Sequence, residues 1–281
     1  MTERSAPNQT QAALWNDLGG RTWVELQDML DRLFQPLETL LVNAAVAAGG
    51  TRVLDVGCGA GSATLAVARA LGSASRCTGI DISAPLIATA TARAAAEGAA
   101  NVTFIEADAQ TYAFEAGSFD TVISRMGVMF FDDPVAAFAN LRRAARRGAE
   151  LAFVAWRSRD ENPFMTAAER SAAAVVSELA RRGDDGPGQF GFASPERVKG
   201  ILEASGWTSI EIRPVDVACS LPVAQLPVYA TRMGPYGRVR GTLDEAARAA
   251  ADVEVLAAFD RFVDGKHVRF TSAFWRVKAV A

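Results

Sequence analysis

The sequence predicts an α/β protein built on a doubly wound, seven-stranded, mostly parallel sheet. Between residues 51 and 156, short apolar runs alternate with alanine-rich amphipathic stretches, which indicates strands that alternate with helices. This alternation is typical of a parallel sheet with helices on both faces, whose buried strands are apolar throughout. A chain of 281 residues, 50% of them hydrophobic, is long enough to bury a substantial core around such a sheet.

Seven strands are expected, five of them in that region and two near the C-terminus. The first five are RVLDV, RCTGIDI, VTFIEA, FDTVIS and ELAFVAW, and the last two are SIEIRPVDV and KHVRFTSAFWRVKAV. Stretches of helical length separate these strands, and we expect helices at Ser62–Leu71, Pro85–Glu97 and Pro134–Arg146. This order of strands and helices gives the doubly wound arrangement.

The first 48 residues are expected to form an N-terminal helical lid. Apolar residues recur at helical spacing between Leu26 and Leu41, and Pro36 should break or bend the helix that they indicate. The segment ALWNDLGGRTW places Trp15 and Trp23 on either side of a Gly-Gly pair. Because glycine is conformationally permissive, this pair favours a movable cover.

The sheet domain is expected to span residues 49–281 and to carry two helical cap insertions, at about 160–192 and 222–263. In the first insertion we expect a helix at Pro163–Arg182, followed by the Gly- and Asp-rich loop RRGDDGPGQFG. In the second we expect one long helix, TLDEAARAAADVEVLAAFDRFV, with Thr242 as its N-cap.

Composition and charge exclude several classes of partner. The net charge of −3 and the pI near 5.4 give an acidic field, which repels nucleic acid backbones and anionic membranes. We therefore expect a small-molecule partner, with no nucleic acid and no membrane, and we leave a homodimer open. The three cysteines are widely spaced and the chain has one histidine, so no metal site is indicated.

Two further features favour a cytoplasmic location. The N-terminal segment MTERSAPNQTQ is polar and lacks the apolar core of a secretory leader. No apolar run reaches the roughly 18 residues that span a bilayer. The odd number of separated cysteines does not indicate a disulfide framework, and we therefore expect a reducing compartment.

The clearest ligand-binding signal is RVLDVGCGAGSATLAVARAL, in which a strand, a glycine-rich turn and a helix follow one another. Glycine at such a turn lets a ligand approach the backbone, and the first N–H groups of the helix favour a negative group. The turn lies at the carboxyl end of a parallel strand, where open α/β sheets bind their ligands. We therefore expect Asp55, Gly57, Gly59 and Gly61 to hold a small molecule.

Two ligand classes compete for this turn. A dinucleotide fingerprint requires a third glycine where the chain has Ser62, which weakens the pyrophosphate interpretation. Asp81, at the end of the second strand, can accept hydrogen bonds from both hydroxyls of a ribose. Asp108, at the end of the third strand, can accept from an adenine amino group, since an ionised carboxylate is an acceptor only. This spaced set of residues is more specific than the glycines alone.

Four segments resemble motifs of the class I S-adenosylmethionine-dependent methyltransferases. VLDVGCGAG is similar to the first motif of that family, GIDIS to its ribose-binding motif, EADA to its adenine motif, and FDTVISRMGVMFFDDP to its strand-four region. The resemblance covers Thr51 to about Trp156, and the C-terminal strand–helix–strand is similar to the antiparallel hairpin that closes the fold. It implies a Rossmann-like methyltransferase fold, S-adenosylmethionine as cofactor and S-adenosylhomocysteine as product.

The resemblance also implies a set of cofactor-binding residues. The three glycines would line the methionyl part of the cofactor, Asp81 the ribose, and Asp108 with the Ala109 backbone the adenine. Arg125 would meet either the cofactor carboxylate or an acidic neighbour. Cys58 is interpreted as a small filler within the loop. The full set is Asp55, Gly57, Cys58, Gly59, Gly61, Asp81, Ile82, Asp108, Ala109 and Arg125.

The acceptor is expected to be a small aromatic or lipophilic molecule. Family members that act on nucleic acid bases often carry an Asn/Asp-Pro-Pro-aromatic run after strand four, whereas this chain has SRMGVMFF. The soft apolar side chains there suit a lipophilic acceptor, although packing in the core is an equally good reason for them. The candidate acceptor-binding residues are Trp15, Trp23, Met126, Phe130, Trp156 and Phe164.

The expected chemistry requires little acid–base catalysis. A sulfonium already activates the methyl group, so the protein mainly aligns the reactants and excludes water. The single histidine, His267, is a weak candidate for a general base. Two alternatives stay open, a cofactor-binding sensor or partner protein without catalysis and an NAD-linked oxidoreductase. Ser62 and the absence of an evident proton-donating Tyr/Lys pair disfavour the second of these.

Overall fold

A mixed sheet forms the centre of the computed structural model, which describes residues 7–176, 179 and 186–281. The strand order is β3-β2-β1-β4-β5-β8-β6, and the short β7 pairs only with β8. β8 is antiparallel to β5 and β6, whereas β1 to β5 are parallel. The strands are β1 (Arg52–Val56), β2 (Arg76–Asp81), β3 (Val102–Glu106), β4 (Phe119–Arg125), β5 (Ala145–Trp156), β6 (Thr208–Pro222), β7 (Val263–Asp264) and β8 (His267–Val280). The expected seven-stranded sheet is confirmed, and the two-residue β7 is an additional strand.

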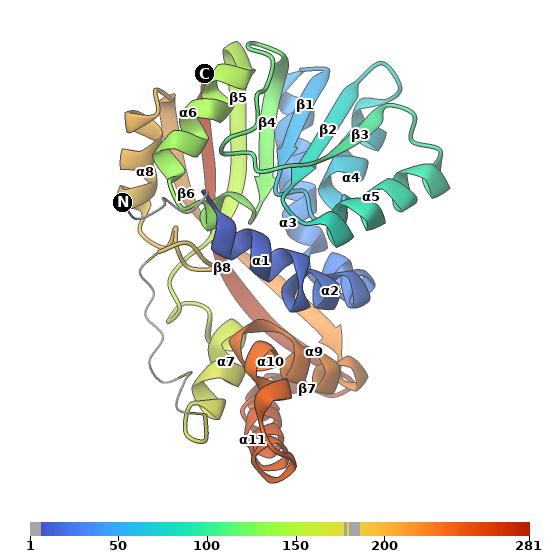
Figure 1. The fold of residues 1–281 in the computed structure, drawn as a ribbon, viewed down its shortest axis with the longest axis vertical. Helices are drawn as coiled ribbons and strands as arrows, with labels where there is room; N and C mark the ends of the chain where they lie inside the picture. Colours follow the sequence, from blue (N-terminus) through green and yellow to red (C-terminus); the bar gives the residue numbers. More distant parts are fainter. Residues whose placement is uncertain (1–6, 177–178, 180–185) are drawn as a thin grey trace, which may run out of the picture.

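The connections cover both faces of the sheet. From β1 the chain moves outward through β2 to β3, then returns to β4 and moves the opposite way to β5. Since parallel crossovers are right-handed, the helices of the two halves lie on opposite faces. The helices of the first half are α4 (Ser62–Leu71) and α5 (Ala84–Glu97), and α6 (Pro134–Ala144) packs with α8 (Pro195–Ala204) in the second. Figure 1 shows these layers around the sheet.

Three helices precede the sheet, namely α1 (Gln9–Asn16), α2 (Leu18–Glu25) and α3 (Gln27–Ala48). Of the two expected effects of Pro36, a break or a bend, the break is wrong, because α3 runs through this proline. Leu33, Leu37 and Leu41 are fully buried along α3. Burying each leucine contributes about 2 kcal/mol, which together exceeds the roughly 3 kcal/mol that a proline costs inside a helix.

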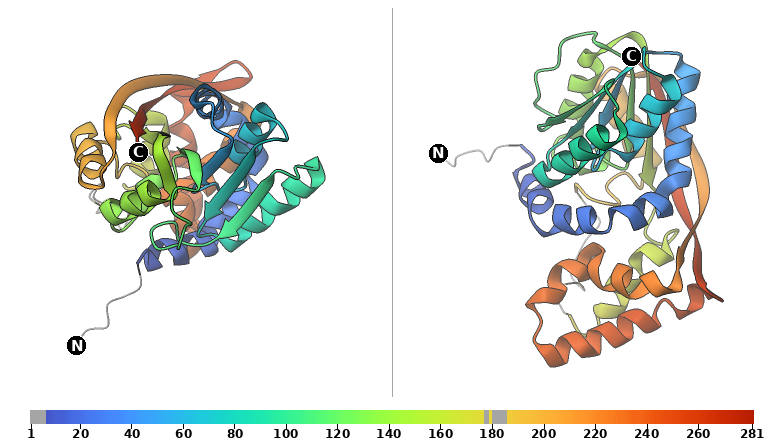
Figure 2. Two further views of the ribbon diagram at one scale, coloured as in Figure 1. Left: turned by 90° about the horizontal axis from the view of Figure 1, so that it is seen from above. Right: turned by 90° about the vertical axis from the view of Figure 1, so that its right-hand side faces the viewer.

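The Gly-Gly pair does not separate the two N-terminal helices. The chain turns at Asp17, and both glycines lie inside α2. A Cβ added to Gly20 would lie 2.0 Å from the carbonyl oxygen of Trp15. Gly20 therefore permits close packing of α1 on α2 rather than a hinge. Both helices lie under the edge of the sheet where β1 to β5 end, as the two views of Figure 2 show.

A layer of helices lies beyond that edge and is called the cap below. It consists of α7 (Pro163–Ala172), α9 (Leu226–Arg232), α10 (Gly234–Val239) and α11 (Glu245–Ala257). α7 ends ten residues earlier than expected, and positions 181–185 of the expected loop lie outside the described residues. The expected N-cap at Thr242 is wrong, since the Asp244 carboxylate accepts from the Ala247 amide at 2.8 Å and begins α11.

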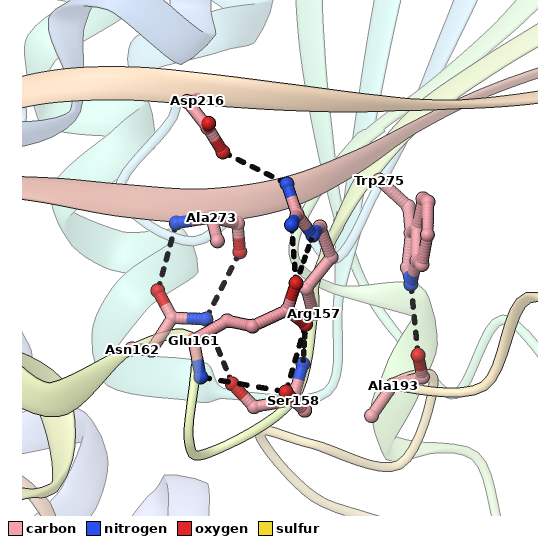
Figure 3. A network of polar contacts seen from close by, with 8 residues as sticks. All are labelled: Arg157, Ser158, Glu161, Asn162, Ala193, Asp216, Ala273 and Trp275. Carbon is pink, nitrogen blue, oxygen red and sulfur yellow. Dashed lines mark hydrogen bonds and ion pairs between the residues drawn. The ribbon is translucent and has the colours of Figure 1, made fainter.

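A polar network joins the cap to the sheet (Figure 3). The side chain of Asn162, which is 1% exposed, donates to the Ala273 carbonyl at 3.0 Å and accepts from the Ala273 amide at 2.8 Å. Arg157 forms ion pairs with Glu161 and Asp216 and lies over the Trp275 ring. These contacts hold the turn between β5 and α7 against β8. β6 and β8 continue from the sheet into the cap, so the cap is fixed at several points.

No helix among residues 7–176, 179 and 186–281 is long and apolar enough to cross a membrane.

Candidate active site

A cavity of about 380 Å³ lies between the carboxyl ends of the parallel strands and the cap. Its walls come from the glycine turn, from α1 and α2, from the end of β4 and from the cap helices. Every cofactor-binding and acceptor-binding residue expected from the sequence lines this cavity, except Gly61. A Cβ on Gly61 would lie 2.7 Å from the Phe104 ring, so this glycine permits packing behind the turn.

The glycine turn is held by β2. The amides of Gly57 and Cys58 donate to the Ile80 carbonyl at 2.8 and 3.1 Å. A Cβ on Gly57 would lie 2.6 Å from the Cα of Gly127, so the turn and the end of β4 touch through their backbones. Gly59 has φ +56°, and no atom lies within 4 Å of where its Cβ would be. Gly59 therefore presents bare backbone to the open cavity.

Asp81 and Asp108 stand at the ends of neighbouring strands, as expected. One carboxylate oxygen of Asp81 accepts from the Gly59 amide at 2.8 Å, and the other accepts from the Ser83 amide at 2.9 Å. Burial raises the pKa of Asp81, while these amides lower it. The Ser83 hydroxyl donates to the Trp15 carbonyl at 2.6 Å. Asp81 thus links the glycine turn to the start of α5.

Asn8 contacts Asp108 although the two residues are 100 positions apart. Its amide nitrogen lies 2.9 Å from each oxygen of the Asp108 carboxylate and 3.2 Å from Oε1 of Gln110. Its backbone amide donates to Asp132 at 2.6 Å, and its side-chain oxygen accepts from the Asp132 amide at 2.6 Å. Asn8 is 2% exposed. Sequence reasoning missed this residue, because no local pattern marks a contact of this range.

Two polar atoms of opposite charge lie buried at the inner wall without a hydrogen-bond partner among the described residues. They are Oδ1 of Asp55 and Nη1 of Arg125. Thr64 donates to the other Asp55 oxygen at 2.6 Å, and Asp31 lies 3.6 Å from Arg125, whose side chain is 10% exposed. Burial raises the pKa of Asp55 to about 6, although Thr64 and Arg125 lower it. A buried polar atom without a hydrogen-bond partner is costly, so these two atoms are suited to a ligand with complementary charges.

Cys58 is buried within the glycine turn. Burial raises the pKa of its thiol well above the usual value, and Asp81 and Asp55 raise it further. A thiol in such surroundings stays protonated and is a poor nucleophile. The interpretation of Cys58 as a small filler agrees with this environment. The other cysteines, Cys77 and Cys219, are also buried and unpaired.

The end of β4 forms an aromatic wall with α1 and α2. Met126 has φ +64° and turns the chain into the short 3₁₀ helix Val128–Phe130. The Phe130 ring meets Trp15 edge to face at 5.4 Å, and Trp15 meets Trp23 at 6.0 Å between ring centroids. Edge-to-face contacts at these distances are favourable. The wall therefore brings together candidate acceptor-binding residues from the N-terminal helices and from the segment after β4.

The part of the cavity nearest the cap is aromatic with one buried ion pair. The Phe164 ring stacks on Phe270 at 3.5 Å and lies 5.3 Å from Tyr229. Trp156 packs on other rings and is 3% exposed. Glu169, 5% exposed, pairs with Arg159 at 2.7 Å. Tyr229, Glu169 and Arg159 were not predicted, because their approach to the turn depends on how the cap folds.

His267 lies away from this cavity. It is exposed at the hairpin of β7 and β8, opposite Asp264 and Pro222, and is not among the cavity-lining residues. The structure therefore does not bring the weak candidate for a general base to the site. Among the described residues, no group of three or more His, Cys, Asp or Glu side chains is arranged to hold a metal ion.

Comparisons with known proteins connect this site with methyl transfer. Residues 53–148 match a sequence family described as a methyltransferase domain. Aklanonic acid methyltransferase of a Streptomyces species is 36% identical over 120 residues, which are 43% of this chain and 54% of that protein. Nocamycin O-methyltransferase of Saccharothrix syringae is 28% identical over 226 residues, 78% of this chain and 80% of that protein.

The chain spans about half the length of several curated relatives that it matches at 34% identity or more. Among solved structures, the YcgJ protein of Bacillus subtilis is similar to this chain with a TM-score of 0.56 and 17% identity. The similarity covers 88% of this chain and 98% of that chain. Likeness at this identity concerns the fold, and it confirms the doubly wound fold class.

Proposed function

We propose, for a chain whose residues 53–148 match a methyltransferase domain, that the protein is an S-adenosylmethionine-dependent methyltransferase that transfers a methyl group to a small aromatic or lipophilic acceptor. S-adenosylmethionine is the cofactor and S-adenosylhomocysteine the product. The proposal extends from the matched domain to the whole chain, including the cap.

One observation carries this proposal, namely the orphaned atoms of Asp55 and Arg125 beside the glycine turn. The methionyl end of the cofactor is a zwitterion, with an ammonium and a carboxylate on one carbon. Asp55 would hold the ammonium and Arg125 the carboxylate, which gives each of the two orphaned atoms a hydrogen-bond partner. An NAD cofactor has no such zwitterion, so the pair favours the methyltransferase over the oxidoreductase.

The remaining cofactor contacts follow the ends of the strands. Asp81 would accept from the ribose hydroxyls, and Asp108 from the adenine amino group. Gly59 offers backbone without a Cβ to the ligand between them. The first-turn amides of α4 and the loop around Ala109 complete the cradle.

The bound cofactor supplies a methyl group already activated by a sulfonium. The chain's own residues then have to position the acceptor in line and exclude water, an effect that can contribute several kcal/mol. Trp15 and Phe130 close one side of the cavity, and Trp156 and Phe164 close the cap side. Burial raises the pKa of Tyr229, so its hydroxyl stays protonated; it donates to the Met165 sulfur at 3.5 Å, a weak bond that it could exchange for one to an oxygen of the bound substrate.

The acceptor class is supported by the aromatic walls and by the relatives. Flat aromatic or lipophilic molecules bury well against faces such as those of Trp156 and Phe164. Aklanonic acid methyltransferase and nocamycin O-methyltransferase are named for small organic acceptors. We extend that class of acceptor to this chain as part of the proposal.

Calorimetric titration tests the cofactor assignment. The purified protein is titrated with S-adenosylmethionine, S-adenosylhomocysteine and NADH. We expect dissociation constants of about micromolar order for the first two ligands and no binding of NADH. Binding of NADH alone would replace the proposal with the oxidoreductase. Binding of the first two without turnover over a broad acceptor panel would favour the non-catalytic sensor.

The affinity for the cofactor should depend on pH through Asp55. The carboxyl has a pKa of about 6 in the free protein, above its ordinary value, because burial disfavours the charged form. The cofactor ammonium requires the ionised form, so affinity is full above pH 6. It falls as the pH drops through 6, by up to about tenfold per pH unit.

Titrations from pH 8 to pH 5 measure this dependence, with Asp55→Asn as the comparison. The asparagine does not ionise, so its affinity should be lower at neutral pH and flatter below pH 6. The Asp81 carboxyl also has a raised pKa, which leaves a smaller slope in the variant. Identical pH curves for the wild type and Asp55→Asn would remove Asp55 from the cofactor site.

A further inference from the structure

The carboxylate of Asp108 has one vacant acceptor position. Its Oδ1 accepts from the Asn8 side chain at 2.9 Å and from the Gln110 backbone amide at 2.8 Å. Its Oδ2 also accepts from Asn8 at 2.9 Å, and within the part of the chain that the structure describes it has no second donor. Each carboxylate oxygen has two lone pairs, so Oδ1 is fully used and Oδ2 can take one more donor. Asn8 thus fixes which oxygen, and which direction, is left for a ligand.

The position suits asparagine in both backbone and side chain. Asn8 has φ +55°, in the left-handed region that asparagine tolerates better than most residues. Its amide supplies the donors to Asp108 and Gln110, and its oxygen accepts from the Asp132 amide. The side chain is neutral, so it joins Asp108 and Asp132 without adding a third negative charge.

The opposite end of α1 is held in a similar way. The Asn16 side chain donates to the Ile82 carbonyl at 2.9 Å and accepts from the Ala84 amide at 2.8 Å. No residue of α1 itself is buried. The helix therefore lies across the ends of β2 and β3, held by asparagines at both ends in addition to the ring contacts of Trp15.

We propose that Asn8 is a positioning residue of the cofactor site, which aligns Asp108 for the 6-amino group of adenine and ties α1 down over the bound adenosine. This inference rests on the proposed function. The amide of Asn8 prevents the Asp108 carboxylate from rotating, so the vacant position on Oδ2 stays directed to the adenine edge. Recognition of the amino group then requires a residue 100 positions away from Asp108 in the chain.

Two ligands separate this role from a merely structural one. S-adenosylhomocysteine is compared with its analogue in which purine, without the 6-amino group, replaces adenine. Asn8→Ala should lower the affinity for S-adenosylhomocysteine by about tenfold or more, because Asp108 loses its alignment. The same substitution should lower the affinity for the purine analogue by less than about threefold, because that ligand has no amino group for Asp108 to bind.

Asn16→Ala is the matched control, because it loosens the other end of α1 without touching Asp108. It should lower the affinities for both ligands by the same factor. Calorimetry gives the affinities, and thermal unfolding shows that each variant is folded. If Asn8→Ala lowers the affinities for both ligands equally, or lowers neither, the proposed role of Asn8 is overturned. A wild-type protein that binds neither ligand would overturn the proposed function itself, and the inference with it.

Discussion

Gly59→Ala is expected to lower the affinity for S-adenosylhomocysteine by at least about a hundredfold, a loss of roughly 3 kcal/mol. Gly59 lines the cavity, and the new methyl group meets no protein atom within 4 Å beyond its chain neighbours, so it would take up space that the ligand is proposed to fill. The fold should tolerate the change. Alanine at φ +56° costs about 1 kcal/mol of stability, because the left-handed region is unfavourable for residues with a Cβ.

Gly98→Ala provides the matched control for that substitution. Gly98 follows α5, has φ +64°, and also has no atom within 4 Å of its added Cβ. The variant should lose the same stability of about 1 kcal/mol, but the new methyl group lies away from the cavity. Its affinity for S-adenosylhomocysteine should therefore equal that of the wild type. Calorimetry and chemical denaturation measure the two quantities. Equal binding by both variants would mean that the cofactor does not lie against Gly59.

Asn162→Ala is expected to destabilise the protein by about 3 kcal/mol, measured by urea unfolding. The side chain makes three buried or partly buried hydrogen bonds, two to the backbone of Ala273 and one to the Ser158 carbonyl. Its removal takes this partner from the buried Ala273 amide, whereas the Ala273 carbonyl still accepts from the Arg157 amide at 3.0 Å. An unsatisfied buried group costs about 1 to 3 kcal/mol.

Ser158→Ala tests whether the buried part of that network carries the effect. The Ser158 hydroxyl donates to Glu161 in an exposed arrangement. Arg157 lowers the pKa of Glu161, but exposed ion pairs contribute at most about 1 kcal/mol. We expect Ser158→Ala to change stability by less than about 1 kcal/mol. A loss as large as that of Asn162→Ala would place the main contribution in the exposed contacts instead.

The sheet and the glycine turn could be predicted because their signals are local. Each parallel strand is a short, mostly apolar run, and each acid of the site lies near or just past the carboxyl end of its strand. Asp55, Asp81 and Asp108 therefore reach one edge as a consequence of strand direction alone. α4 begins and ends at the expected residues, since glycines stand at both of its ends.

The wrong or missed predictions concern residues whose conformation or contacts depend on other parts of the chain. Pro36 does not break α3, because buried leucines on the same helix compensate for its cost. Thr242 does not cap α11, because Asp244 offers a better-placed acceptor two residues later. No local sequence pattern marks Asn8, since its partners Asp108 and Asp132 lie 100 and 124 positions away. Only tertiary structure brings such residues together.

β6 and β8 run without interruption from the sheet into the cap, and Asn162 fixes the cap to them. The wall nearest the cap is formed largely by residues 159–170 and 229–259, whereas the groups proposed to hold the cofactor come from residues 8–16 and 55–125. The two halves of the cavity therefore belong to separate parts of the gene. Under the proposed function, substitutions in the cap should alter which acceptor is taken while the residues proposed to hold the cofactor stay intact.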